Sequence, residues 1–239
     1  MFKACKTLFL LIFSCVALSA QVSLEDGQFE GTIITKKGEE KGIIWLNGND
    51  MSPWRLQKTV LFLPEKKFLK AKKLKRNDFD KYKPKDILGY RFADRVFLTR
   101  KYSEAASIGV NLLPSRHFLE ALVEGEMMVF RYYTTPESVG MAEVIDKERE
   151  EARNNPLTLL ELDEEDLQPV HMVNFYELLE DCDFVYDKYD TGGYGFMPKP
   201  EEKKNKGLKG LINRSLETAN AEFVLDMAKD YNSECGADQ

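Results

Sequence analysis

The stretch FLEALVEGEMMVFRYYT, residues 118–134, decides the fold that the sequence predicts. Two largely apolar runs flank Glu124-Gly125, and this pattern is typical of a β-hairpin with a two-residue loop. In that register Glu120 faces Val129 and lies diagonal to Arg131 on the same face. Both faces are largely apolar, so we expect this hairpin near the centre of an antiparallel sheet that is covered on both sides.

Strand patterns precede and follow this hairpin, and helical patterns come last. Residues 29–46, 87–102 and 157–172 each have the pattern of a further hairpin. From Val173 onward the period of the apolar residues changes from two to 3.6, which predicts a helix from Asn174 to about Cys182 and a last helix from about Ser215. The order indicates an α+β fold, with an antiparallel β meander or partly closed barrel followed by a helical C-terminal part.

The first residues, before the β-rich part, have the pattern of an export signal. Two lysines precede an uncharged run over residues 7–20, which is shorter than the roughly 20 apolar residues of a spanning helix. We interpret residues 1–20 as a signal peptide cleaved after Ala20. Cys15, preceded by a small residue, leaves lipid attachment as an alternative, and a single membrane anchor is a weaker one. The predicted domains are then a β-rich domain over 21–172 and a helical subdomain over 173–239.

Cleavage after Ala20 leaves two cysteines, Cys182 and Cys235. In an exported chain this pair predicts one disulfide, and closing a loop of about 54 residues would stabilise the fold by roughly 4 kcal/mol. A redox or metal-binding thiol is the weaker alternative, because no CxxC is present and the two histidines lack ligand spacing. No metal and no cofactor are expected, and the mature chain is expected to have no transmembrane helix.

Charge is unevenly spread along the chain. Residues 55–101 hold 16 basic and 5 acidic residues, whereas residues 137–190 hold 17 acidic and 4 basic ones. The most basic stretch, residues 66–76, would suit nucleic acid in a cytosolic protein, but the export signal argues against that partner. We interpret it as an edge strand guarded by lysines. The acidic run over 163–166 lacks the ligand pattern of an EF-hand loop and is interpreted as a solvated turn.

The segment from Gly192 to Lys206 is the candidate partner-binding loop. Tyr194, Phe196 and Met197 are apolar residues in a Gly- and Lys-rich stretch that should be exposed. The alternative is a linker whose aromatic side chains pack against the helices. No catalytic residue is predicted, because no hydrolase motif occurs and His117 and His171 fit structural or surface positions better than a site.

Several short stretches together resemble a known family. They are GTIITKKGEEKGII, PKDILGYRF, FLEALVEGEMMVFRYY, FYELLEDCDFV and the terminal DYNSEC, in this order after an export signal. The chain resembles an exported family, common in Bacteroidota, whose function is uncharacterised. The resemblance implies a β-rich module followed by helices with a paired cysteine, and it implies no activity.

Three functions fit these features. The first is an exported, non-enzymatic envelope or secreted module, located in the periplasm or outside the cell, with outer-membrane association left open. Its partner would be an unidentified protein or glycan, and the sequence leaves its oligomeric state open. The alternatives are a periplasmic hydrolase with an unrecognised site and a surface protein anchored by lipid on Cys15.

Overall fold

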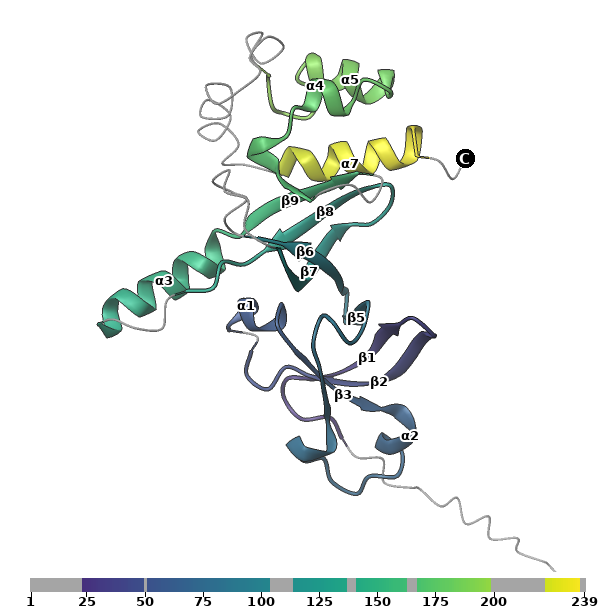
Figure 1. Cartoon of the computed structure of the whole chain (residues 1–239), viewed down its shortest axis with the longest axis vertical. Coiled ribbons are helices and arrows are strands. Elements are labelled where there is room, and N and C mark those ends of the chain that lie inside the picture. The colour runs from purple at the N-terminus through teal and green to yellow at the C-terminus, as the bar shows by residue number, and fades with distance from the viewer. Residues whose placement is uncertain are drawn as a thin grey trace, which may run out of the picture.

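The computed structural model describes residues 23–49, 51–103, 114–136, 141–162, 167–198 and 222–236. Ten strands form one antiparallel sheet in the order β10-β9-β8-β7-β6-β5-β1-β2-β3-β4 (Figure 1). The strands are β1 Gln28–Thr35, β2 Gly38–Trp45, β3 Val60–Pro64, β4 Asp80–Tyr82, β5 Gly89–Phe92, β6 Arg95–Tyr102, β7 Ser115–Val123, β8 Met127–Tyr132, β9 Leu157–Leu162 and β10 Gln168–Pro169. The α+β prediction is confirmed.

The sheet consists of two meanders joined edge to edge. Strands β1 to β4 are consecutive neighbours, as are β5 to β10, and β1 pairs antiparallel with β5 where the two meanders meet. The sheet is open, with β4 and β10 at its edges, so of the two predicted forms the meander is correct and the partly closed barrel is wrong. Each edge strand is only two or three residues long, which limits pairing with other chains.

Helices lie at the two ends of the sheet and beside it. They are α1 Pro53–Leu56, α2 Glu65–Phe68, α3 Ala142–Asn154, α4 Phe175–Leu178, α5 Asp183–Asp190 and α7 Glu222–Glu234. Helix α7 packs on β7 and β8, and α4 and α5 lie outside it (Figure 1). Apolar side chains of these helices and of the sheet form one buried cluster, which includes Met127, Val129, Val185 and Met227. None of the described helices is long and apolar enough to span a membrane.

The single helix predicted from Asn174 to about Cys182 is wrong. The chain forms the short helix α4, turns after Leu179, and starts α5 with Cys182 at its N-cap. Leu179, Cys182 and Val185 are all fully buried, and the break between the helices lets all three side chains reach the core. The last helix is present, but its predicted start at Ser215 lies outside the described residues.

The central hairpin forms where the sequence predicts it, with a different register. Strands β8 and β7 are the third and fourth from the β10 edge, and both faces of the hairpin are buried, as Phe118, Leu119, Val129 and Phe130 show. Glu120, however, pairs directly with Arg131, and the register shifts between Ala121 and Val123. This β-bulge and a loop over residues 124–126 replace the predicted two-residue turn.

Asn232 of α7 holds this loop in place. Its side-chain oxygen accepts a hydrogen bond from the Met127 N–H at 2.7 Å, and its Nδ2 donates to the Met127 carbonyl at 2.9 Å and to the Glu124 carbonyl at 3.3 Å. The amide thus pairs with Met127 as a neighbouring strand would. A contact from a residue 105 positions away therefore fixes the hairpin end.

Replacing Asn232 by alanine should lower the free energy of unfolding by about 1–3 kcal/mol, because the Met127 N–H would lose its partner in a part-buried place. Amide hydrogen exchange measures the effect locally: the Met127 amide should exchange faster than the amides of β6. An Asn232→Asp variant keeps the acceptor and loses the donor. Its exchange rate at Met127 should therefore fall between the rates of the wild type and the alanine variant. Unchanged exchange at Met127 in the alanine variant would contradict this role.

A buried carboxylate on β7 joins the neighbouring strands β6 and β8. Glu120 accepts hydrogen bonds from Arg95 Nε at 2.7 Å, Arg131 Nη1 at 3.5 Å and the Tyr133 hydroxyl at 3.4 Å. Burial lowers the pKa of Arg95, but the hydrogen bond to Glu120 and its charge outweigh this and raise it. Burial and the same carboxylate raise the pKa of Tyr133. These groups form one hydrogen-bonded cluster on the face that also carries Phe97 and Phe118, with a single carboxylate between two guanidinium groups.

Candidate functional site

A pocket of about 420 Å³ lies at the rim of the sheet, where four segments of the chain meet. Its lining comes from the β1–β2 turn, the segment before β5, the facing ends of β6 and β7, and the region of β9 and Leu167. Its size lies within the range of small-molecule sites. We call it the basic pocket because five of its lining residues are basic: Lys36, Lys85, Arg100, Lys101 and Arg116.

The segment before β5 is fixed by backbone and hydroxyl hydrogen bonds. The Thr99 hydroxyl donates to the Ile87 carbonyl at 2.8 Å and also contacts the Pro84 carbonyl at 3.2 Å. The Leu88 N–H donates to the Ile34 carbonyl at 2.7 Å, and the Leu88 carbonyl accepts from the Thr99 N–H at 2.8 Å. This segment therefore bridges β1 and β6 and holds Lys85 at the pocket.

One ion pair forms the buried part of the pocket. Arg100 Nε donates to Glu161 at 2.5 Å, and the Glu161 side chain is only 5% exposed. The Arg100 guanidinium also lies 5.2 Å from the centre of the Phe130 ring, in cation–π geometry. Arg100 and Glu161 thus neutralise each other, and neither leaves a free charge for a ligand.

Four cations around the pocket have no acidic partner among the residues that the structure describes. Lys36, Lys85, Lys101 and Arg116 are exposed, and within the described residues none of them makes an ion pair. The other acid in the lining, Asp86, accepts a hydrogen bond from the Lys83 N–H at 2.8 Å. The pocket therefore carries a surplus of positive charge.

Two of these cations stand directly opposite each other. Lys101 of β6 and Arg116 of β7 are cross-strand partners in the sheet register. Like charges in this position destabilise a sheet, because their side chains lie side by side. An anionic group bound between them would remove this repulsion. The pocket also has an aliphatic wall, formed by Pro84, Ile87, Leu88 and Leu167. The cations and this wall together suit a ligand that carries negative groups on an otherwise uncharged molecule.

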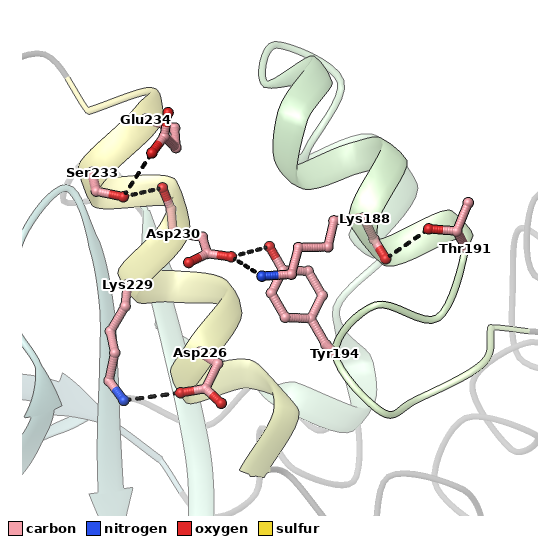
Figure 2. A network of polar contacts seen from close by, with 8 residues as sticks. All are labelled: Lys188, Thr191, Tyr194, Asp226, Lys229, Asp230, Ser233 and Glu234. Carbon is pink, nitrogen blue, oxygen red and sulfur yellow. Dashed lines mark hydrogen bonds and ion pairs between the residues drawn. The ribbon is translucent and has the colours of Figure 1, made fainter.

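The aromatic residues of the predicted partner-binding loop pack onto the helices. Phe196 stacks on Phe223 with ring centroids 4.6 Å apart, and Tyr194 donates its hydroxyl to Asp230 at 2.9 Å (Figure 2). Met197 alone is exposed, at 68%. Burial and the hydrogen bond to Asp230 raise the pKa of Tyr194. Two of the three side chains are thus tied to the helices, as in the alternative interpretation of this segment.

Asp230 is the centre of the polar network that holds the segment. It also accepts a hydrogen bond from Lys188 Nζ at 2.6 Å, and this ammonium group lies 4.5 Å from the centre of the Tyr194 ring (Figure 2). Burial opposes ionisation of Asp230, but the hydrogen bonds from Lys188 and Tyr194 outweigh it and lower its pKa. The network ties α5 and the segment after it to α7.

The predicted disulfide is confirmed. Cys182 and Cys235 are bonded, with their Cα atoms 5.9 Å apart. The bond joins the N-cap of α5 to the residue after α7, beside the network of Asp230. The sequence alone therefore predicted which two cysteines are bonded.

The two histidines lie in ordinary surroundings. The His117 ring packs edge-on against Tyr132 at 5.5 Å, and its Nε2 shares a hydrogen bond with the Ser115 hydroxyl at 2.6 Å. His171 lies in a short 3-10 helix after β10. In the part of the chain that the structure describes, no group of three or more His, Cys, Asp and Glu is arranged to hold a metal ion. The acidic run over 163–166 lies outside that part.

Sequence reasoning missed the basic pocket. Lys85 and Lys101 belong to the basic block over 55–101, but Lys36 and Arg116 do not, and only the fold brings them together. The sequence contains one hint of the pocket. When the strands over 95–102 and 115–123 are aligned antiparallel, as they are in the structure, Lys101 lies opposite Arg116.

Comparisons of the chain with protein-family models, curated proteins and solved structures found no match. The resemblance to an exported family stays a prediction. The functional argument therefore depends on the geometry of this chain.

Proposed function

We propose that this protein is an exported, non-enzymatic module that binds an acidic glycan in the basic pocket. The observation that carries the proposal is a set of four cations around one cavity that make no ion pair with any described residue: Lys36, Lys85, Lys101 and Arg116. A glycan with carboxylate, phosphate or sulfate groups would pair with these cations, while its sugar rings would lie against the aliphatic wall.

Two features support the location outside the cytoplasm. The sequence of residues 1–20 has the pattern of an export signal, and the Cys182–Cys235 disulfide is of the kind that persists in oxidising compartments. We place the protein in the periplasm or outside the cell. Its ligand would then be one of the acidic polymers or oligosaccharides available there.

The proposal predicts that removing two pocket cations abolishes most of the binding. The probes are an oligosaccharide of galacturonic acid and a neutral oligosaccharide of equal length, measured by titration calorimetry. The wild type should bind only the acidic probe, and Lys101→Ala/Arg116→Ala should bind it about 10- to 100-fold more weakly, because two charge-assisted contacts are lost. Its melting temperature should stay the same or rise, because the two cations repel each other.

The matched control is Lys72→Ala/Lys73→Ala, which removes the same charge from exposed side chains away from the pocket. It should keep nearly full affinity for the acidic probe. Equal losses in both double variants would mean that net charge and not the pocket attracts the ligand. Wild-type binding that is absent, or equal for both probes, would refute the proposal. Binding of an acidic peptide in preference to the acidic glycan would refute the choice of a glycan.

A further inference from the structure

A second basic surface lies apart from the pocket, on α2 and the turn that follows it. Seven cations are exposed there within eleven residues: Lys66, Lys67, Lys70, Lys72, Lys73, Lys75 and Arg76. We call this set the lysine platform. Its only ion pair among the described residues joins Lys67 to Asp80 at 2.9 Å, with both side chains more than half exposed. Such a pair is screened by water and leaves the platform strongly positive.

The platform is anchored to the core and is not the edge strand that the sequence suggested. Phe68 and Leu74 are buried against Ile43, Leu63 and Phe79, so the last residue of α2 and the end of the turn after it are both fixed to the core. The edge strand β4 follows it. Two apolar anchors six residues apart hold the lysines on a fixed part of the surface.

One apolar side chain projects among the lysines. Leu69 is 63% exposed and lies between Phe68 and Lys70. The aromatic residues nearest to it in sequence, Phe62 and Phe68, are buried, as is Phe79. An exposed aliphatic residue within a cationic surface is suited to lipid head groups, whereas binding of single-stranded nucleic acid relies on exposed aromatic rings.

Among the described residues, charge is polarised along the long axis of the molecule. Helix α2 lies toward one end, and α4 and α5 lie toward the other (Figure 1). The region of α4 and α5 carries six acidic residues and one basic residue, Lys188; the acids are Glu177, Glu180, Asp181, Asp183, Asp187 and Asp190. Near an anionic surface this dipole would turn the lysine platform toward the surface and the acidic end away.

We infer that the lysine platform docks the protein on a membrane surface rich in anionic lipids, with Leu69 inserted among the head groups. Each basic residue near such a surface contributes about 1 kcal/mol, so seven of them suffice for peripheral binding without a spanning helix. No platform residue lines the basic pocket, so the two surfaces can be occupied together. The inference is independent of the proposed glycan ligand.

Sedimentation with vesicles tests it on the full mature chain. The protein should bind vesicles of phosphatidylglycerol and phosphatidylethanolamine, should not bind vesicles of phosphatidylcholine, and should be released as salt is raised. Lys66→Ala/Lys70→Ala/Lys73→Ala should weaken binding on the order of 100-fold. Leu69→Ser should weaken it several-fold, mainly at the higher salt concentrations, where the apolar contact carries more of the binding.

The matched control is Lys36→Ala/Lys85→Ala/Lys101→Ala, which removes the same charge from the basic pocket. It should bind vesicles like the wild type and should lose the acidic oligosaccharide, whereas the platform variant should show the opposite pattern. Absence of vesicle binding, equal binding to phosphatidylcholine, or equal losses in both triple variants would overturn the inference. Tighter binding of nucleic acid or an acidic polysaccharide to the platform would also overturn it.

Discussion

Replacing Glu120 by alanine should lower the free energy of unfolding by about 3 kcal/mol. The carboxylate is buried, with 7% of its side chain exposed, and it pairs with both Arg95 and Arg131. Removing one partner of a buried charge cluster typically costs about 3–5 kcal/mol, because the remaining charge is left uncompensated. The two arginine side chains are 29% and 37% exposed, so water relieves part of this cost and the lower end of the range applies.

Equilibrium unfolding in urea measures this loss. Glu120→Gln keeps the size and one acceptor of the side chain but removes its charge. If it loses about as much free energy of unfolding as Glu120→Ala, the effect comes from the charge. Glu124→Ala is the control on the same hairpin, because that carboxylate is 48% exposed and lies 3.9 Å from Arg91. It should cost less than about 1 kcal/mol. Similar losses at Glu120 and Glu124 would contradict a special role for the buried cluster.

The sequence predicts the elements of this region better than their register. The hairpin over 118–134, its central place and its cover on both faces follow from the apolar pattern alone. Glu120 was expected diagonal to Arg131 and lies directly opposite it. The difference arises from the β-bulge and from Asn232, which binds both backbone groups of Met127. Local patterns carry no information on a contact over this distance in sequence.

The candidate sites show the same limit. The disulfide was predictable, because the interpretation of residues 1–20 as an export signal leaves two cysteines, which can pair only with each other. The loop aromatics Tyr194 and Phe196 were recognised, but their packing on Phe223 and Asp230 depends on α7. The basic pocket draws its cations from four segments, so no window of sequence contains it. Its detection needed the sheet order that joins the two meanders.

Removing the disulfide should have the largest effect of all the changes considered. Replacing Cys182 and Cys235 by serine should lower the free energy of unfolding by about 4 kcal/mol, because the bond closes a loop across 53 positions of the chain. In the chain-entropy account the loss arises in the unfolded state, which gains freedom. The folded state keeps the contacts of Asp230 with Lys188 and Tyr194, so the variant should still fold at low temperature.

Urea unfolding with and without a reducing agent separates this effect from damage to the core. Reduction should destabilise the wild type to the level of the double serine variant and should leave the variant unchanged. The unreduced intact mass of the protein from its native host adds a second readout. It should match residues 21–239 less the two hydrogens lost in forming the bond, whereas a mass starting at Cys15 with acyl chains would mean a lipid anchor. A wild type that is equally stable when reduced would show that the bond contributes nothing to stability, and that α7 is held by its packing, by Asn232 and by the network of Asp230.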